Sequence, residues 1–452
     1  MKKVLSLVVA VLLAVAVLAG CAPAAGTPAT EAPAAEAPAS EAPAAEAPAA
    51  ESNAAGEPVT IPWAVFETNN YTPDFYQHII DTFEADNPDI KIEKVLMTGD
   101  SRMQFQKTML AAGPFPDVTM EANDLSNIEG VYAEVPEEII SKFDDAAVVE
   151  CFGKKTLIPA GKQYRIQCFY NKDQFEEAGI AEAPKTWDEF VAACDKLVAA
   201  GKTPLICGGA KDIWATGLYW TATGNMDVMQ NYPDFNRDLL DGKVKWANPV
   251  ISETLKAWKS LVDAGYYHKG SMSFGYTQAS EEFTKGAAAM MLDGSWAAVG
   301  ADASGTDNLG VFVMPSPEGI NTYCTDIQYW GVSEDSPNTE AAFRFVDYVL
   351  GGNPELYSYY LQADGYGSLT KEPVEYERGP LTTQFIANYD GMTLVPEIVK
   401  VKGDDALPAG TQDFIDKSLQ SIFTGADVDS ELAKWDAELA RMLEAQEANT
   451  AE

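Results

Sequence analysis

Basic residues are scarce in this sequence. Lys and Arg total 31 against 68 Asp and Glu, which gives the 452-residue chain a formal net charge of −37. Binding to nucleic acid requires clustered basic side chains that displace counterions from phosphates, so we expect no nucleic-acid partner. Attraction of cationic solutes such as polyamines stays open, although dispersed carboxylates mainly serve solubility.

Histidine is also rare, and the cysteines do not occur in the closely spaced pairs that are typical of metal sites. The two histidines, His78 and His268, lie far apart, and no CxxC pair occurs, so we expect neither a metal site nor a cofactor. Besides Cys21 there are five cysteines, an odd number; a disulfide between Cys151 and Cys168 is one option in an oxidising exterior. The sequence contains no nucleophile elbow, phosphate loop or zinc motif, so we predict that the chain is not an enzyme, the alternative being a secreted glycosidase or lyase.

The N-terminus has the pattern of an export signal with a lipid attachment site. Lys2 and Lys3 precede an apolar run that ends at Leu18-Ala-Gly-Cys21. Residues 1–20 are therefore predicted to be a signal peptide, and Cys21 is predicted to carry the lipid. Acyl chains would hold the mature protein at the outer face of the cytoplasmic membrane.

Residues 21–56 are expected to form a tether. After Cys21 the segment repeats Ala, Pro and Glu and contains no aromatic residue, so it has nothing with which to build a core. Proline keeps such a chain extended. The remaining residues are enough for two lobes with two cores.

The folded part opens with alternating strands and helices. Strands are expected at 59–65, around 90–95 and after Pro116-Asp117, with helices between them, which implies a parallel sheet with right-handed crossovers. Ligands gather at the carboxyl ends of such strands. The loops 67–71 and 121–124 occupy two of these ends.

A central stretch, residues 153–190, shows how the chain leaves the first lobe. Gln163, Arg165 and Gln167 alternate along a polar strand and so share one face, which suggests a cleft between lobes. Thr186 and Glu189 form a capping box that opens the following helix.

The same stretch resembles a known family. Gly153-Lys154 with Ile158-Pro159, Tyr170-Asn-Lys-Asp173 and Pro184-Lys-Thr-Trp-Asp-Glu-Phe190 are similar to the middle signature of the maltose-binding-protein-like extracellular solute-binding proteins, which serve carbohydrate ABC importers. The turn Pro116-Asp117-Val118 and the fragment from Gly286 to Trp296 are similar to this family too. The resemblance covers roughly residues 57 to 445.

The resemblance implies an α/β, two-lobe periplasmic-binding-protein-like fold of type II. Each lobe would be a mainly parallel sheet flanked by helices, and the lobes would be joined by a hinge that the chain crosses several times. The expected N-terminal lobe is 57–165 with 311–351, and the expected C-terminal lobe is 166–310 with 352–452.

The resemblance also implies sugar-binding positions. Glu67 and Asp124 would accept hydrogen bonds from sugar hydroxyl groups, because charge-assisted hydrogen bonds are strong. Trp296 would stack on a sugar ring. Tyr366 is either a cleft residue or a plain turn residue, and either Trp214 or Trp220 could face the ligand instead of the core. The full expected set of ligand-binding residues is Glu67, Asn69, Glu121, Asp124, Gln163, Arg165, Lys211, Trp214, Trp296, Asp326, Trp330 and Tyr366.

The expected function is capture of a mono- or oligosaccharide and its delivery to the permease and ATPase of an ABC importer by cleft closure. The protein is expected to act as a monomer. The alternatives are a different solute, namely a polyamine, a sugar acid or a sugar phosphate, and a surface sensor or adhesin without a transport role. Arg165 and Lys211 together could hold one negative group of such a solute.

Overall fold

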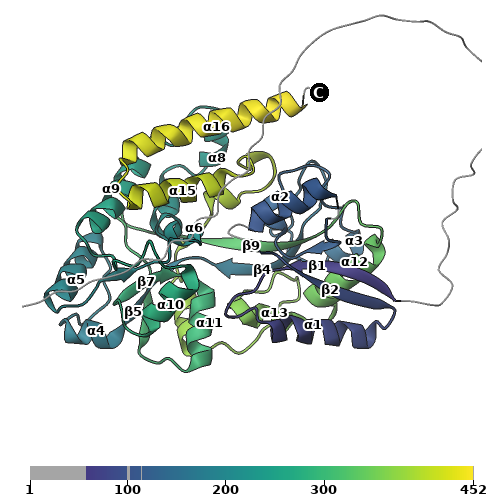
Figure 1. Ribbon diagram of the computed structural model, residues 1–452, viewed down its shortest axis with the longest axis horizontal. Helices are drawn as coiled ribbons and strands as arrows, with labels where there is room; N and C mark the ends of the chain where they lie inside the picture. Colours follow the sequence, from purple (N-terminus) through teal and green to yellow (C-terminus); the bar gives the residue numbers. More distant parts are fainter. Residues whose placement is uncertain (1–57, 99–101, 114, 451–452) are drawn as a thin grey trace, which may run out of the picture. The chain divides into compact units, whose positions relative to one another are not determined.

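The computed structural model describes residues 58–98, 102–113 and 115–450, so the predicted signal peptide, Cys21 and the whole tether lie outside the described residues. Two β-sheets flanked by helices form the described part (Figure 1). The expected α/β class is therefore confirmed.

The first sheet has six strands in the order β10-β9-β3-β1-β2, with β4 paired to β9. β1 is parallel to β2 and β3, whereas β9 is antiparallel to β3 and β4. The last residues of β1 are buried on both sides, as expected of a strand whose sheet is covered by helices on both faces. The strands are β1 (Val59–Val65), β2 (Ile90–Leu96), β3 (Val118–Thr119), β4 (Ile158–Tyr164), β9 (Thr322–Val332) and β10 (Thr393–Pro396).

The helices around this sheet are set by their caps and apolar faces. In α1 the Thr72 hydroxyl accepts a hydrogen bond from the Phe75 amide, and Pro73 occupies the first turn, where its missing N–H costs nothing. Phe75, Ile79 and Phe83 then enter the first core. The helical segments are α1 (Pro73–Asp86), α2 (Arg102–Ala112), η1 (Ala122–Leu125), α3 (Glu137–Ile140), α12 (Thr339–Asp347), η3 (Tyr348–Gly352) and α13 (Pro354–Asp364).

The second sheet has four strands in the order β6-β7-β5-β8. β6 and β7 are parallel, but β5 is antiparallel to both of its neighbours. The expectation of a mainly parallel sheet is therefore wrong for this half. Its core includes Cys168, Cys194 and Trp258. The strands are β5 (Gln167–Asn171), β6 (Leu205–Ile206), β7 (Met290–Asp293) and β8 (Leu309–Phe312).

The predicted capping box opens α5. The Thr186 hydroxyl accepts from the Glu189 amide at 3.3 Å, and the Glu189 carboxylate accepts from the Thr186 amide at 3.2 Å. The helical segments that follow β4 in the chain, other than α12, η3 and α13, are α4 (Lys172–Glu177), α5 (Trp187–Ala199), α6 (Ile213–Thr216), η2 (Trp220–Gly224), α7 (Asn225–Asn231), α8 (Phe235–Leu240), α9 (Pro249–Asp263), α10 (Tyr276–Thr284), α11 (Ser295–Ser304), α14 (Pro380–Ala387), η4 (Ile398–Lys400), η5 (Gly403–Asp405), α15 (Thr411–Phe423) and α16 (Val428–Thr450).

Two long strands connect the two halves. β4 and β9 run side by side across the middle of the molecule, between β1 and β2 on one side and β5 and β7 on the other (Figure 1). β4 passes into β5 after only two residues, 165 and 166. The polar face that the sequence places on this strand therefore lies where the chain leaves one sheet for the other.

Two segments pack differently from the expected lobe division. Val311 and Phe312 end β8 in the second sheet, although residues from 311 on were expected in the first lobe. Helix α13 was expected in the second lobe, but its Tyr360 lies in the first core, where Trp330 donates a hydrogen bond to its hydroxyl. The apolar face of α13 fits the aromatic cluster of the first sheet, which explains its place. The lobe boundaries as a set stay a prediction.

The disulfide considered between Cys151 and Cys168 is absent. All five cysteines in the described part of the chain are free. Cys168 lies in the second core, whereas Cys151 lies in a small cluster beside the first sheet, so their thiols belong to different parts of the fold.

Candidate functional site

The described part of the chain contains a cavity of about 900 Å³. Its wall combines the loop after β1, the end of β4, the middle of β9, and one side of α10 and of α11. The volume suits a small-molecule ligand. Ten of the twelve expected ligand-binding residues line it: Glu67, Asn69, Glu121, Asp124, Gln163, Arg165, Trp214, Trp296, Asp326 and Tyr366.

Two expected residues do not line this cavity. Trp330 is fully buried in the first core, where its ring lies 5.1 Å from that of Trp63. Lys211 is exposed to solvent and does not line the cavity, so it cannot hold one ligand group together with Arg165. Of the two tryptophans weighed against each other, Trp214 lines the cavity and Trp220 packs against Trp246 and Trp435.

An aromatic wall formed by Trp214, Tyr276 and Trp296 bounds one side of the cavity. The Trp296 Nε1 donates to the Tyr276 hydroxyl at 2.7 Å, and the rings of Trp214 and Tyr276 lie 4.8 Å apart. Gly294 precedes α11 with an ordinary φ of −99°. A Cβ at this position would lie 2.1 Å from the Trp296 ring, so glycine is needed for space.

Asp293 and Tyr276 connect this aromatic wall to the end of β7. The Tyr276 hydroxyl donates to the Asp293 carboxylate at 3.0 Å, and the Gly294 amide donates to it at 2.9 Å. Asp293 is only 2% exposed. Burial raises the pKa of Asp293 to about 7, with hydrogen bonds opposing the shift.

Asn70 joins the two sides of the cavity. Its side-chain amide donates to the Asp364 carboxylate at 2.8 Å and to the main-chain oxygen of Trp296 at 3.1 Å. Tyr366, whose hydroxyl lies 3.3 Å from Asp364, is fully buried and also accepts from Gln163 at 3.3 Å. Burial raises the pKa of Asp364 to about 6.

The predicted carboxylates near the first sheet are already engaged with the protein. Glu67 forms a half-exposed ion pair with Lys94 at 2.8 Å, and Glu121 forms one with Arg102 at 2.9 Å. Asp124 accepts from the Gln106 amide at 3.3 Å. Burial, followed by the nearby Glu121 charge, raises the pKa of Asp124 to about 7.

Arg165 is neutralised inside the protein. Its Nε lies 2.6 Å from a carboxylate oxygen of Glu397, which is only 3% exposed, and its Nη1 donates to Gln163 at 2.7 Å. Asp326 lies nearby, with Lys400 Nζ at 3.7 Å from its Oδ2. The polar strand face is thus a paired network at the cavity wall.

Several polar lining residues were not predicted: Asn70, Arg102, Asp212, Tyr276, Asp293, Asp364, Lys400, Gln412, Asp413 and Asp416. Asp293 stands immediately before the Gly-Ser-Trp fragment and could have been found from it. Tyr276, Asp364 and Asp416 carry no motif that marks them as binding residues. In the part of the chain that the structure describes, no three His, Cys, Asp or Glu side chains are placed to hold a metal ion.

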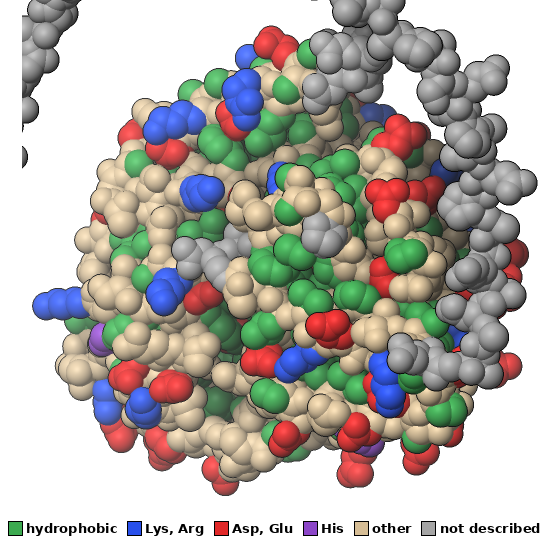
Figure 2. Space-filling view, turned by 45° about the vertical axis from the view of Figure 1, so that its right-hand side comes forward, with side chains coloured by type: hydrophobic (Ala, Val, Ile, Leu, Met, Phe, Trp, Pro, Cys, Tyr) green, Lys and Arg blue, Asp and Glu red, His purple; other side chains and the backbone are tan. Residues whose placement is uncertain are grey.

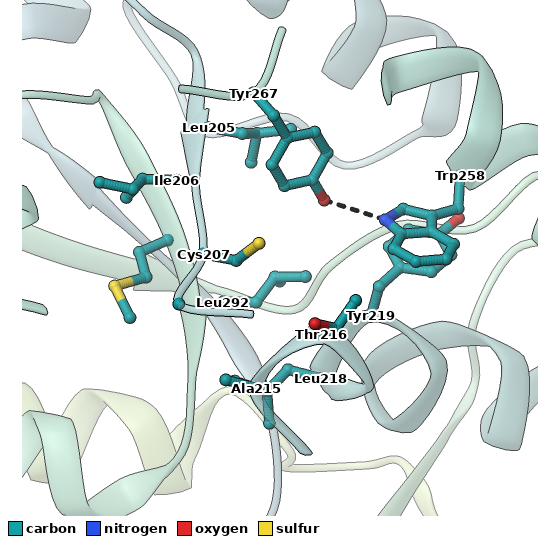
Figure 3. A pocket seen from close by; sticks show the side chains of 12 residues that line it. Leu205, Ile206, Cys207, Ala215, Thr216, Leu218, Tyr219, Trp258, Tyr267 and Leu292 are labelled. Atoms are coloured by element: carbon teal, nitrogen blue, oxygen red, sulfur yellow. Dashed lines mark hydrogen bonds between the residues drawn. The ribbon is translucent and has the colours of Figure 1, made fainter. Parts of the chain in front are cut away.

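A second cavity, of about 10 Å³, lies between β6 and α9 (Figure 3). Leu205, Tyr219 and Trp258 line it, and Trp258 Nε1 donates to the Tyr267 hydroxyl at 3.0 Å. A space of this size holds one water molecule at most. The larger of these two cavities is therefore the candidate site.

A family comparison decides the class of the protein. The model of the bacterial extracellular solute-binding proteins matches residues 69–351, which is more than half of the chain. The chain is a bacterial extracellular solute-binding protein. Members of this family capture a small solute, typically a sugar, for an ABC transporter, and they are not enzymes. The family expected from the sequence is thereby confirmed.

Similar proteins include a curated relative and two solved structures. The chain is 32% identical over 187 residues to an sn-glycerol-3-phosphate-binding periplasmic protein of Brucella abortus, covering 39% of this solute-binding protein and 41% of the relative. The solved structure of a chitin oligosaccharide binding protein is similar with a TM-score of 0.68 and 23% identity, over 86% of this chain and 99% of that one. A solute-binding protein in complex with raffinose is similar with a TM-score of 0.67 and 21% identity, over 85% and 99%. At these identities the two structures support the two-lobe fold alone.

On the face shown in Figure 2, acidic and basic side chains are interspersed, with no basic patch among the described side chains. Within the described ranges, every helix is too short or too polar to cross a membrane.

Proposed function

We propose that this solute-binding protein captures a mono- or oligosaccharide in the 900 Å³ cavity. The observation that carries the proposal is the aromatic wall of Trp214, Tyr276 and Trp296 beside buried carboxylates. A sugar ring has faces of C–H groups that pack on an indole, and hydroxyl groups that donate to carboxylates. Both kinds of partner line the same cavity.

Capture and release require the cavity to open and close. We propose that the lobes 57–165 with 311–351 and 166–310 with 352–452 close over the solute, with boundaries adjusted for β8 and α13. Closure is driven only by contacts that are better in the closed state. Glu67 and Asp124 on one side and Trp296 on the other supply such contacts. The closed monomer would then dock on the permease of an ABC importer, whose ATPase drives release.

A phosphorylated solute is the second candidate, because the Brucella abortus relative is named for sn-glycerol 3-phosphate. Phosphate recognition needs cations that are free to pair with the ligand. Arg102, Arg165 and Lys400 line the cavity, but each is paired with a carboxylate of the protein. The saccharide is therefore the better-supported solute.

Calorimetric titration of the protein with a panel of neutral oligosaccharides, amino sugars, sugar acids and glycerol phosphates tests this proposal. We expect saturable binding of a neutral or amino saccharide, and loss of that binding in Trp296→Ala. Tight binding of a phosphate ester and of no sugar would refute the saccharide assignment. Absence of binding across the panel would favour the sensor or adhesin role.

We also propose that lipid on Cys21 anchors the protein at the outer face of the membrane. The support is the sequence Leu18-Ala-Gly-Cys21 after an apolar run. Labelled palmitate should be incorporated into the native protein and not into Cys21→Ala, which should appear in the culture medium or periplasm. Equal membrane retention of both proteins would refute the anchor.

A further inference from the structure

Asp293 and Asp364 are buried carboxylates that face the cavity without a cationic partner. They are 2% and 7% exposed, and their hydrogen-bond donors are the neutral groups of Tyr276, Gly294, Asn70 and Tyr366. In the described part of the chain, no Lys, Arg or His nitrogen lies within ion-pair distance of either carboxylate. Neutral donors only partly offset the cost of removing a charge from water.

The basic side chains that line the cavity form ion pairs with carboxylates other than Asp293 and Asp364. Among the described lining residues the basic ones are four, and each forms an ion pair with another carboxylate: Arg102 with Glu121, Arg165 with Glu397, Lys285 with Glu282 and Lys400 with Asp326. The overall acidity of the chain does not explain this arrangement, because surface carboxylates are solvated and Asp293 and Asp364 are not.

The two carboxylates belong to one place in the cavity. Ser295, two residues after Asp293, donates from its hydroxyl to the main-chain oxygen of Asp364 at 2.9 Å. Asn70 binds both the Asp364 side chain and the Trp296 main chain, and Trp296 binds Tyr276, which binds Asp293. Asp293 and Asp364 therefore flank the first turn of α11.

A third carboxylate gives independent support. Asp326 is 4% exposed and lines the cavity, yet its Oδ2 accepts no hydrogen bond from any described residue, and Lys400 Nζ remains at 3.7 Å. A buried acceptor without a donor is costly and indicates a donor supplied from outside. Asp326 therefore lacks a hydrogen-bond donor at Oδ2, although Lys400 balances its charge.

The aromatic wall defines the rest of the ligand. The ring faces of Trp214, Tyr276 and Trp296 stabilise an adjacent cation by cation–π attraction and also pack on apolar ring faces. We infer that the solute is an ammonium-bearing saccharide, an amino sugar or its oligomer, whose ammonium group binds at Asp293 and Asp364. This inference rests on the proposed saccharide function and adds the charge of the sugar.

A matched pair of ligands tests the inference. The full protein is titrated near pH 7 with glucosamine oligomers and with N-acetylglucosamine oligomers of equal length, which have the same rings but neutral amides. We expect the amine form to bind roughly tenfold or more tightly. Equal or tighter binding of the acetylated form would overturn the inference and leave the saccharide function standing. Binding of spermidine without either sugar would keep the ammonium site and refute the saccharide function, and no binding of any probe would overturn both.

Isosteric variants locate the charge preference. Asp293→Asn and Asp364→Asn should each reduce the affinity for the amine form roughly tenfold more than they reduce the affinity for the acetylated form. Asp227→Asn is the matched control, because Asp227 is fully buried but does not line the cavity, and it should keep the wild-type preference. Folding of each variant is checked by circular dichroism and thermal melting. An amine preference that survives in both folded cavity variants would overturn the assignment to these carboxylates.

Discussion

The side-chain amide of Asn70 donates a hydrogen bond of 3.1 Å to the main-chain oxygen of Trp296. Asn70 follows β1 of the first sheet, whereas Trp296 follows β7 of the second, so the bond ties the two sides of the cavity. The same amide donates to Asp364. One side chain thus places the aromatic wall relative to the loops of the first sheet.

Asn70→Ala should weaken solute binding about fivefold, because a hydrogen bond across the cavity contributes on the order of 1 kcal/mol. Asn70 lies on a partly exposed loop, so we expect little change in the melting temperature of the solute-free protein. Calorimetric titration and thermal melting measure the two effects. An unchanged dissociation constant would show that the bond does not contribute to capture.

Trp296→Ala should lose about 2 kcal/mol of binding free energy, roughly thirtyfold in the dissociation constant, because the indole face of the cavity wall is removed. Trp296 is only partly buried, so the fold should persist. Titration with the solute identified in the panel provides the measurement. Wild-type affinity in the folded variant would remove Trp296 from the binding site.

Trp330→Ala should lower the stability of the protein and leave its affinity for the solute nearly unchanged. Trp330 is fully buried against Trp63 and Phe345, and its removal leaves a large hole in the first core. We expect the free energy of unfolding to fall by about 3–5 kcal/mol. Urea denaturation measures this change, and titration under stabilising conditions should show nearly normal affinity. A strong loss of affinity without loss of stability would show that Trp330 contacts the solute.

Trp330 also shows a feature that could not be predicted from the sequence, namely which residues of a strand reach the cavity. The strand-end rule and the family fragments correctly placed Glu67, Asp124 and Trp296 at one cavity. Asp326 and Trp330 share a strand, but β9 runs past the cavity into the first sheet, where its end pairs with β3. The length of a strand and the point at which it enters a core depend on tertiary packing, which the pattern does not encode.

The unpredicted residues were missed for a related reason. Tyr276 and Asp364 reach the cavity through packing of α10 and α13, and α13 itself was expected in the other lobe. Charge pairing is equally invisible in the sequence: Arg165 and Glu397 are 232 residues apart, yet they form a buried pair. The types of chemistry in the site could be predicted, but their partners could not.

The Arg165 and Glu397 pair makes a further prediction. Arg165→Gln leaves the buried Glu397 carboxylate without a cation, and we expect a loss of about 3–5 kcal/mol in the free energy of unfolding. Arg165→Gln combined with Glu397→Gln removes both charges and should recover most of that loss. Urea denaturation of the three proteins measures the effect. Equal stability of the single and double variants would contradict the account.

The buried carboxylates predict an unusual pH dependence of stability. Burial raises the pKa values of Asp124, Asp293 and Asp416 to about 7 and that of Asp364 to about 6, from an ordinary value of 3.8. Between about pH 4 and pH 7 the folded state then holds more protons than the unfolded state, so these groups make the protein less stable as the pH rises. Each contributes on the order of a few kcal/mol.

The melting temperature of the solute-free protein should therefore fall by several degrees between about pH 5 and pH 8. Differential scanning calorimetry at matched ionic strength measures the trend. Asp293→Asn removes one titrating group and should flatten the profile. Exchange of the exposed Asp427, whose pKa is lowered by hydrogen bonds to Ser430, should not flatten it. A wild-type melting temperature that rises steadily over this interval would show that these carboxylates stay ionised, with a cation from solution as their partner.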